Sequence, residues 1–243
     1  GPRIVDLAVT EAGIPRRFAE REVTSALLLL DALPDLAEAI RPRVVPSVSG
    51  ETTLEWAPYG VVLGWHAANS PVWVPALVVV SALVGGNAVV SRPSQRVRRT
   101  TLAVLDALAA DWPQDAVMVA DLPGPEAESL VCDPGIHAVV AHASTETCKR
   151  HLRRLGEAYA DGVPLRPYIP EASGNDALIV MPGADLAHVA RAAALGGFAN
   201  AGQLCMSAKR MIVHEDLWPN LAPRLAAAVG ELVVGDPGAP DTD

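Results

Sequence analysis

The chain has 243 residues, of which 50% are hydrophobic and 19% are charged, enough apolar material for one large domain or two small ones. Its formal net charge of −9 argues against nucleic-acid binding, because such proteins normally present a basic face. The longest apolar run, residues 72–84, is shorter than the roughly 20 residues that a membrane-spanning helix needs, so no membrane association is expected.

Three cysteines, Cys132, Cys148 and Cys205, show no CxxC spacing, which predicts neither a disulfide framework nor a zinc cluster and favours a reducing cytoplasmic location. No basic segment leads into an apolar one at the start, so no signal peptide is predicted. The chain begins abruptly in a predicted helix and ends in a loop at residues 235–240. Both ends are typical of a piece cut from a longer chain.

The predicted elements follow one another in a regular order. Residues 4–40 predict helices with a break at Pro34, and residues 41–57 are polar and irregular. Short apolar strands then alternate with helices. The predicted strands cover residues 60–64, 87–91, 116–120, 136–142, 177–181 and 210–214. The predicted helices cover residues 71–83, 99–110, 125–131, 146–160, 185–200 and 216–233. Ser70 is placed as the N-cap of the first of these helices, with Pro71 as its first residue.

This alternation predicts an α/β fold in which a parallel sheet is covered by helices on both faces. Ligands of such sheets bind at the carboxyl ends of the strands. The loops that follow Gly64, Ser91, His142 and Met181 are therefore the places where a site is expected.

Several common catalytic and binding motifs do not occur in the sequence. It contains no GxGxxG, no GxxxxGK[ST] and no GxSxG, and its six histidines have no HxxxH or HExxH spacing. A serine hydrolase, a zinc enzyme and a dinucleotide site of the fingerprint type are thus not supported.

Four residues in loops combine reactive or ligand-binding chemistry with an ordinary alternative. Cys205, in Gly-Gln-Leu-Cys, is either a nucleophilic thiolate or a small buried apolar residue. Asn69 either donates a hydrogen bond to a developing oxyanion or serves the turn beside Ser70. Arg92 either binds an anionic or hydroxylated ligand or is a solvated surface cation. Glu171 is either a general base or a simple loop charge.

Taken in chain order, five segments of the sequence resemble the aldehyde dehydrogenase superfamily. They are Asn69-Ser-Pro, Gly86-Asn-Ala-Val-Val-Ser-Arg-Pro-Ser94, Ser144-Thr-Glu146, Glu171-Ala-Ser-Gly174 and Gly202-Gln-Leu-Cys205. The resemblance covers about residues 5 to 243. It implies a Rossmann-like cofactor domain in residues 1–170, helices 4–40 included. Residues 171–243 would then be the first, incomplete part of a second α/β catalytic domain.

The resemblance also implies the role of each catalytic residue. Cys205 would attack the aldehyde carbon, and Asn69 with the Cys205 backbone N–H would hold the oxyanion. Hydride would pass to the nicotinamide ring of NAD or NADP, and Glu171 would activate the water that hydrolyses the thioester. Full-length family members are usually homo-oligomeric. The residues implied to contact the cofactor are Trp65, Arg92, Ser94, Gln95, Ser144 and Ala172.

The sequence also departs from the family pattern. Ala143, Cys148 and Ser173 stand where glycines are common, and Arg92 replaces a usual lysine. Gln95 replaces a frequent glutamate at the ribose, and this loss of a negative charge keeps NADP open beside NAD. The family's catalytic domain continues well beyond residue 243.

Three other functions therefore remain open beside aldehyde oxidation to a carboxylic acid. One is a truncated or degenerate relative that binds a dinucleotide or a partner without catalysis. Another is a CoA-acylating aldehyde dehydrogenase, and a third is an enzyme that reduces an acyl phosphate. Glu171 argues against the last two, because a hydrolytic carboxylate has no use in them.

Overall fold

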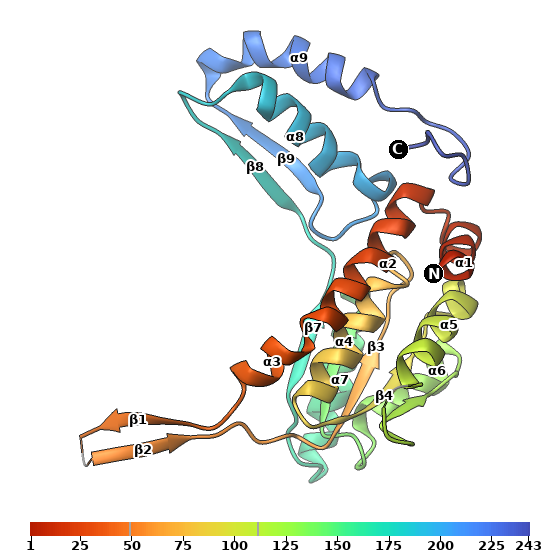
Figure 1. Cartoon of the computed structure of the whole chain (residues 1–243), viewed down its shortest axis with the longest axis vertical. Helices are drawn as coiled ribbons and strands as arrows, with labels where there is room; N and C mark the ends of the chain where they lie inside the picture. The colour runs from red at the N-terminus through yellow and green to blue at the C-terminus, as the bar shows by residue number, and fades with distance from the viewer. Residues whose placement is uncertain (49, 111) are drawn as a thin grey trace. The chain divides into compact units, whose positions relative to one another are not determined.

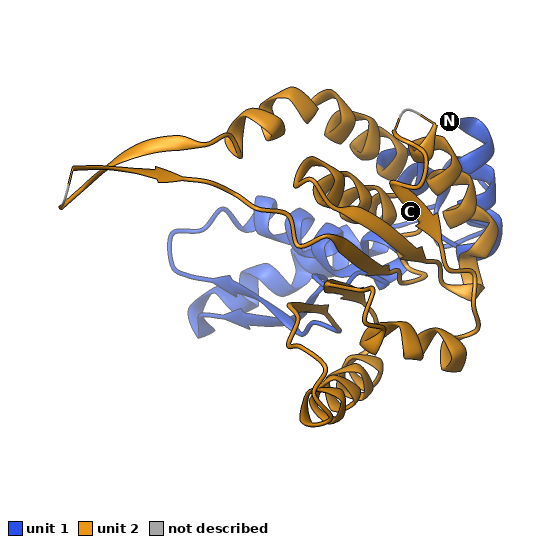
Figure 2. Cartoon of the chain, turned by 90° about the horizontal axis from the view of Figure 1, so that it is seen from below, with its two compact units in different colours: residues 1–21, 173–243 blue, residues 22–172 orange. Residues whose placement is uncertain are grey.

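The computed structural model describes residues 1–48, 50–110 and 112–243 (Figure 1). The chain forms two compact units (Figure 2). Residues 22–172 make up the first, which we call the sheet unit. Residues 1–21 and 173–243 make up the second, which we call the cysteine unit. The units divide at residues 172–173, close to the predicted boundary, whereas residues 1–21 belong with the C-terminal segment. The assignment of cofactor binding to residues 1–170 and catalysis to residues 171–243 remains a prediction.

The sheet unit is built on a five-stranded parallel sheet with the strand order β5-β4-β3-β6-β7. This confirms the predicted fold class. The strands are β3 (Val61–Trp65), β4 (Ala88–Arg92), β5 (Val117–Val119), β6 (Ala138–His142) and β7 (Tyr168–Glu171). The sequence predicted a loop where β7 lies. Among the described residues this strand pairs with β6 alone, and Pro170 within it is tolerated because the strand lies at the edge of the sheet.

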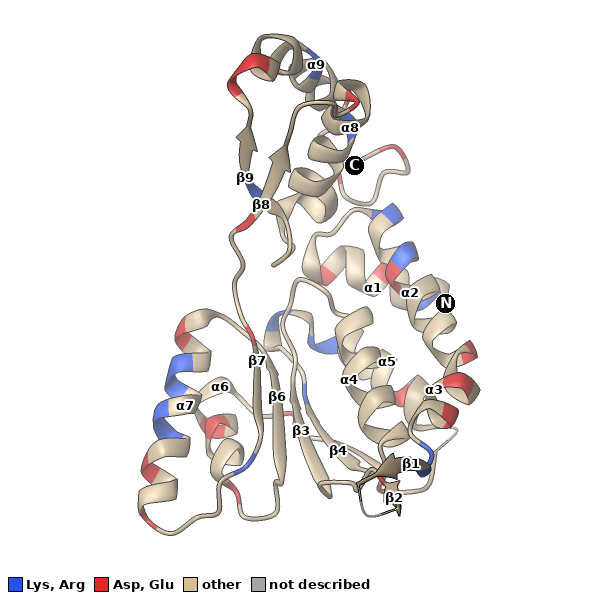
Figure 3. Cartoon of the chain, turned by 90° about the vertical axis from the view of Figure 1, so that its left-hand side faces the viewer, with Lys and Arg blue, Asp and Glu red and all other residues tan. Residues whose placement is uncertain are grey.

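Helices cover both faces of this sheet (Figure 3). On one face lie α4 (Trp73–Val84) and α5 (Arg98–Ala109). On the other lie α6 (Gly124–Ala127), the 3-10 turn η2 (Glu128–Cys132) and α7 (Thr145–Ala160). Side chains of β3 alternate between the two cores, as a pleated strand requires. Leu63 packs in the core beneath α6 and α7, and Gly64 faces Val78 of α4.

The prediction that Ser70 caps α4 was wrong. The helix begins at Trp73, and its N-cap residue is Val72, whose side chain makes no capping hydrogen bond. The Ser70 hydroxyl instead donates to the carboxylate of Glu22. A carboxylate from another helix thus does what a local serine was expected to do.

The N-terminal helices are α1 (Pro2–Ala12), α2 (Arg16–Asp31) and α3 (Leu33–Ala39). Pro34 lies in the first turn of α3, where proline's missing N–H costs nothing. Strands β1 (Arg43–Ser47) and β2 (Gly50–Leu54) then form an antiparallel hairpin, where the sequence predicted irregular chain. Neither strand has a buried residue, so the sequence carries no alternation of polar and apolar residues that would reveal them.

The cysteine unit contains a parallel strand pair, β8 (Asp176–Val180) and β9 (Ala208–Val213), joined by α8 (Leu186–Phe198). Helix α9 (Trp218–Gly230) follows. Val180, Ala190 and Leu221 form the core between these elements. Shorter 3-10 turns are η1 (Gln95–Val97), η3 (Ala199–Gly202) and η4 (Glu215–Leu217). Over the described ranges, no helix combines the length and apolar character needed to cross a membrane.

Candidate functional site

A hollow of about 470 Å³ opens in the sheet unit. Trp65 and Arg92 line it from the C-terminal ends of β3 and β4, where they are register partners. The remaining wall comes from α6, η2 and α7. Its residues are Gly124, Pro125, Glu128, Thr147, Arg150 and Arg154. The hollow therefore lies at the edge of the parallel sheet where ligands of this fold class bind, and its volume is within the range of small-molecule sites.

Arg92 is the buried cation of this hollow. Its residue is 6% exposed, and its guanidinium lies 4.3 Å from the centroid of the Trp65 ring. One guanidinium nitrogen, Nη2, donates to the Leu122 carbonyl at 3.5 Å, whereas the buried Nε has no protein partner. Burial lowers the pKa of Arg92, although Asp121 and Glu128 oppose that effect. A buried cation with an unused donor is suited to an anionic or oxygen-rich ligand.

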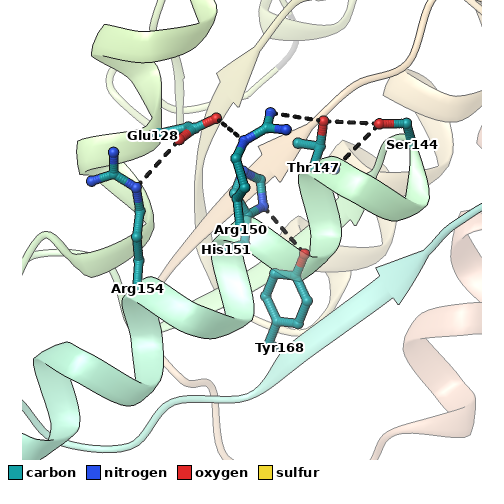
Figure 4. Close-up of polar contacts among 7 residues, drawn as sticks. All are labelled: Glu128, Ser144, Thr147, Arg150, His151, Arg154 and Tyr168. Carbon is teal, nitrogen blue, oxygen red and sulfur yellow. Dashed lines mark hydrogen bonds and ion pairs between the residues drawn. The ribbon is translucent and has the colours of Figure 1, made fainter.

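Part of the wall of the hollow is an ion-pair network (Figure 4). Glu128 accepts from Arg150 Nε at 2.9 Å and pairs with Arg154 Nε at 3.3 Å. Arg150 also donates to Thr147 Oγ1 at 3.2 Å. Thr147, Arg150 and Arg154 lie on one face of α7, because helical residues three or four apart are neighbours. With three arginines and one glutamate, the hollow is locally cationic within a chain of net charge −9.

No motif in the sequence indicated these wall residues. The segment Ser144-Thr-Glu146 resembles a family motif, but the polar positions that follow it along the same helix belong to none of the motifs. The signal is the spacing of Thr147, Arg150 and Arg154 on a helix that begins directly after an apolar strand. Glu128 gave no signal, because a single acid in a short helical turn is usually a solvated charge.

Behind the hollow, a row of rings supports Trp65. The rings of Trp65 and His151 meet edge to face with centroids 4.6 Å apart, and His151 Nδ1 lies 3.2 Å from the Tyr168 hydroxyl. Desolvation is the largest cause that lowers the pKa of His151, to about 4. The imidazole is therefore neutral at pH 7 and acts as packing for the wall rather than as a charged group.

Ser144 and the residues after β4 take up structural roles beside the hollow. Ser144 is the N-cap of α7, and its Oγ accepts from the Thr147 backbone N–H at 3.2 Å. Gln95 Nε2 donates to Asp121 Oδ1 and to the Leu122 carbonyl, both at 3.2 Å. Ser94 is half-buried and precedes η1 without a capping hydrogen bond from its side chain. None of these three side chains lines the hollow.

Asn69 and Glu171 lie elsewhere on the sheet unit. Asn69 is half-buried in the loop between β3 and α4, and Glu171 is the exposed last residue of β7. Glu171 is the register partner of His142, and its carbonyl accepts from the Ala143 N–H at 3.1 Å. The half-buried Ala172 follows it. Asn69 thus lies in one of the loops where a site was predicted, whereas Glu171 ends a strand that the sequence did not predict.

Cys205 is an exposed thiol in the cysteine unit. Helix α8 ends at Phe198, and between it and Cys205 the residues Asn200, Ala201 and Gly202 have φ angles of 55°, 53° and 72°. Two non-glycine residues in the left-handed region in succession mark a strained reversal of the chain. Gly174 faces the Cys205 loop so closely that a Cβ built on it would overlap the Cys205 carbonyl oxygen. The alternative that Cys205 is a buried core residue was therefore wrong.

His66 and Ser91 resemble a catalytic base and nucleophile, but their burial rules out a catalytic role. His66 Nε2 lies 3.2 Å from Ser91 Oγ, and both residues are at most 1% exposed. Desolvation lowers the pKa of His66 to about 3, followed by the effects of His142 and Arg92. Because no substrate reaches these atoms, the pair holds β3 and β4 together rather than carrying out catalysis.

Comparison with known proteins identifies the family of the chain. Residues 2–243 match the aldehyde dehydrogenase family. A succinate-semialdehyde dehydrogenase (NADP(+)) of Deinococcus radiodurans is 30% identical over 98% of this chain and 49% of its own length. The aldehyde dehydrogenase citD of Monascus ruber is 32% identical over 95% of this chain and 45% of its own. The crystal structure of an NAD-dependent benzaldehyde dehydrogenase from Corynebacterium glutamicum superposes with a TM-score of 0.88 at 27% identity. It is covered over 52% of its length by 99% of this chain.

The chain thus spans about half the length of the curated relatives it matches. The match extends over nearly all of the chain and includes both compact units. We conclude from it that the chain belongs to the aldehyde dehydrogenase family.

Proposed function

We propose that the protein oxidises an aldehyde to a carboxylic acid with NAD or NADP, and that Cys205 is the nucleophile. The observation that carries this proposal is the exposed Cys205 thiol on a strained turn, held against Gly174 within a chain of this family. Backbone strain persists where the surrounding structure over-determines it, and such residues cluster at active sites.

The hollow of the sheet unit fits the phosphate-bearing part of a dinucleotide. Its three arginines supply positive charge, and the buried Arg92 Nε has an unused donor. We propose that Arg92, Arg150 and Arg154 hold the dinucleotide, with Trp65 as an aromatic wall. When bound, the nicotinamide supplies the hydride acceptor that the oxidation requires.

The chain's own residues would carry the remaining chemistry. The Cys205 thiolate forms a bond to the aldehyde carbon, and the carbonyl electron pair moves onto the oxygen. The Asn69 amide and the Cys205 backbone N–H donate to that oxyanion. After oxidation leaves an acyl thioester, Glu171 takes a proton from water. The resulting hydroxide attacks the acyl carbon, the carbon–sulfur bond breaks, and the carboxylic acid and the Cys205 thiolate are released.

The test is aldehyde-dependent formation of NAD(P)H, followed at 340 nm with a panel of aldehydes. We expect turnover by the chain and its loss, by a factor of at least 10³, in Cys205→Ala. Cys132→Ala is the matched control, because Cys132 is a half-buried cysteine of η2 to which no catalytic role is assigned. Turnover that survives in Cys205→Ala would contradict the proposed nucleophile.

A second candidate, dinucleotide binding without catalysis, is favoured by one observation. The hollow is formed entirely by residues of the sheet unit and does not include Cys205. Calorimetry separates the two functions. Dinucleotide binding without turnover of any aldehyde would support the binding module.

The CoA-acylating alternative is tested separately. If water releases the acyl group, addition of CoA should not alter turnover.

A further inference from the structure

Glu22 is a buried carboxylate that the chemistry proposed above does not use, and it forms no ion pair with a cation in the part of the chain that the structure describes. It lies in α2, and its residue is 4% exposed. Its partners belong to the loop between β3 and α4. The Ser70 hydroxyl donates to Oε1, the Val72 N–H donates to Oε2 at 3.1 Å, and the Trp73 N–H is a further donor.

These partners include the first turn of α4. The first N–H groups of a helix have no partner within the helix and need an acceptor from outside. Val72, the N-cap residue of α4, offers no side-chain acceptor. Glu22 fills this role from another helix and at the same time holds the hydroxyl of Ser70, which is 7% exposed.

The same contacts bear on Asn69, which immediately precedes Ser70 in the sequence. Asn69 lies on a stretch without regular secondary structure, between the end of β3 at Trp65 and the start of α4 at Trp73. The amide of an oxyanion donor must be held within a few tenths of an ångström to be effective. Glu22 fixes the loop at the residue directly after Asn69 and again at the start of the helix.

We infer that Glu22 is a positioning residue that orients the Asn69 amide by binding the Ser70 hydroxyl and the Val72 N–H. The inference rests on the proposed function of Asn69. Glu22 touches none of the reacting groups itself and acts only through the loop.

The inference predicts a particular pattern of kinetic effects. Glu22→Ala should lower kcat at least tenfold while changing the dinucleotide Kd less than twofold. Glu22→Gln should recover most of kcat, because the amide oxygen still accepts from Val72 and its NH₂ group can bond Ser70. Ser70→Ala should fall between the two. Glu20→Gln, an exposed carboxylate of the same helix, is the matched control and should retain the kcat of the original chain.

A double-mutant cycle distinguishes positioning from general destabilisation. In an Asn69→Ala background, Glu22→Ala should lower kcat no further, because the group that it orients is gone. If Glu22→Ala lowers kcat by the same factor in both backgrounds, or leaves kcat unchanged, the inference is overturned. If Glu22→Ala does not fold, Ser70→Ala measured in both backgrounds gives the same decision.

Hydrogen exchange tests the inference even if no aldehyde is oxidised. In Glu22→Ala and Ser70→Ala, the backbone amides of Ser70, Val72 and Trp73 should exchange at least tenfold faster than in Glu20→Gln, while amides of β4 and β6 remain unchanged. Unchanged exchange at Ser70, Val72 and Trp73 would overturn the positioning role. Absence of turnover with the expected exchange pattern would instead reject the proposed function and leave the Glu22 contacts established.

Discussion

At the level of single residues, the exposure of Cys205 follows from the backbone on either side of it. Asn200, Ala201 and Gly202 reverse the chain in left-handed conformations after α8. Gln203 Nε2 donates to the Asn200 carbonyl at 3.3 Å, and Lys209 Nζ donates to the Gly202 carbonyl at 3.2 Å. These two hydrogen bonds hold the turn in place, and the exposed thiol of Cys205 is accessible to a reagent.

Gly174 offers a direct test of this support. We expect Gly174→Ala to destabilise the cysteine unit by about 1–3 kcal/mol, because the new methyl group must displace the Cys205 carbonyl. The labelling rate of Cys205 with iodoacetamide should change with it. Gly230→Ala is the control, because a methyl group added there, at the end of α9, would meet no atom within 4 Å. Urea unfolding measures the first effect and mass spectrometry the second. Equal behaviour of the two variants would contradict the claim that Gly174 supports the Cys205 turn.

At the level of elements, α7 both lines the hollow and packs against the core, and the sequence shows these roles only in part. The sequence predicted a basic helix over residues 146–160, and the structure has it from Thr145 to Ala160 with Ser144 as its N-cap. The face that lines the hollow consists of Thr147, Arg150 and Arg154, whereas His151 points into the core. A basic helix is usually a solvated one, so the pattern did not indicate a wall. Only the position of Glu128 on η2 shows that two of these arginines are held in place.

The link between α2 and α4 makes a prediction about pH. Desolvation is the largest cause that raises the pKa of Glu22, from 4.5 to about 7, and the hydrogen bonds from Ser70, Val72 and Trp73 oppose it. Between pH 4.5 and 7 the folded chain therefore binds a proton that the unfolded chain has released. The free energy of unfolding should fall as pH rises through this interval, by about 3 kcal/mol in all, and level off above it.

Glu22→Gln isolates this contribution, because glutamine cannot titrate. The lowered pKa values of His66 and His151 act in the opposite sense below pH 6.5, but both proteins share them. Urea unfolding at pH 5, 6, 7 and 8 measures the free energy of unfolding of both proteins. Relative to that of Glu22→Gln, the free energy of unfolding of the original chain should fall as pH rises. A constant difference for Glu22→Gln would mean that Glu22 titrates near its ordinary pKa when folded.

The elements also show why some structure could be predicted and some could not. Strands β3, β4 and β6 are buried apolar runs bounded by glycine, proline or polar residues, and such runs were found within a few residues. The β1–β2 hairpin and β7 escaped because their side chains are mostly exposed. Asn69, Arg92 and Cys205 were recognised from motifs. Glu22 and Glu128 could not be, since their partners are distant in sequence and only the fold brings them together.

At the level of the whole molecule, charge is distributed unevenly. The chain has a net charge of −9, which repels an anionic dinucleotide at long range, whereas the hollow gathers three arginines against one glutamate. Screening limits the repulsion to about 10 Å at 0.1 M salt, so the local cations decide binding once the ligand arrives. Gln95, which carries no charge where the family often has glutamate, adds no repulsion beside them.

A pair of variants on α7 separates the local charge from the overall charge. Arg154→Gln and Arg153→Gln each remove one positive charge, but only Arg154 lines the hollow. We expect Arg154→Gln to weaken NADP binding about tenfold and NAD binding less, because NADP carries an additional phosphate. Arg153→Gln should change both affinities less than twofold. Titration calorimetry at 0.05 M and 0.3 M salt measures each Kd, and the effect of Arg154→Gln on NADP binding should shrink at the higher concentration. Equal weakening by the two variants would show that overall charge governs binding, and tighter binding of NAD than NADP would show that the arginines do not select the additional phosphate.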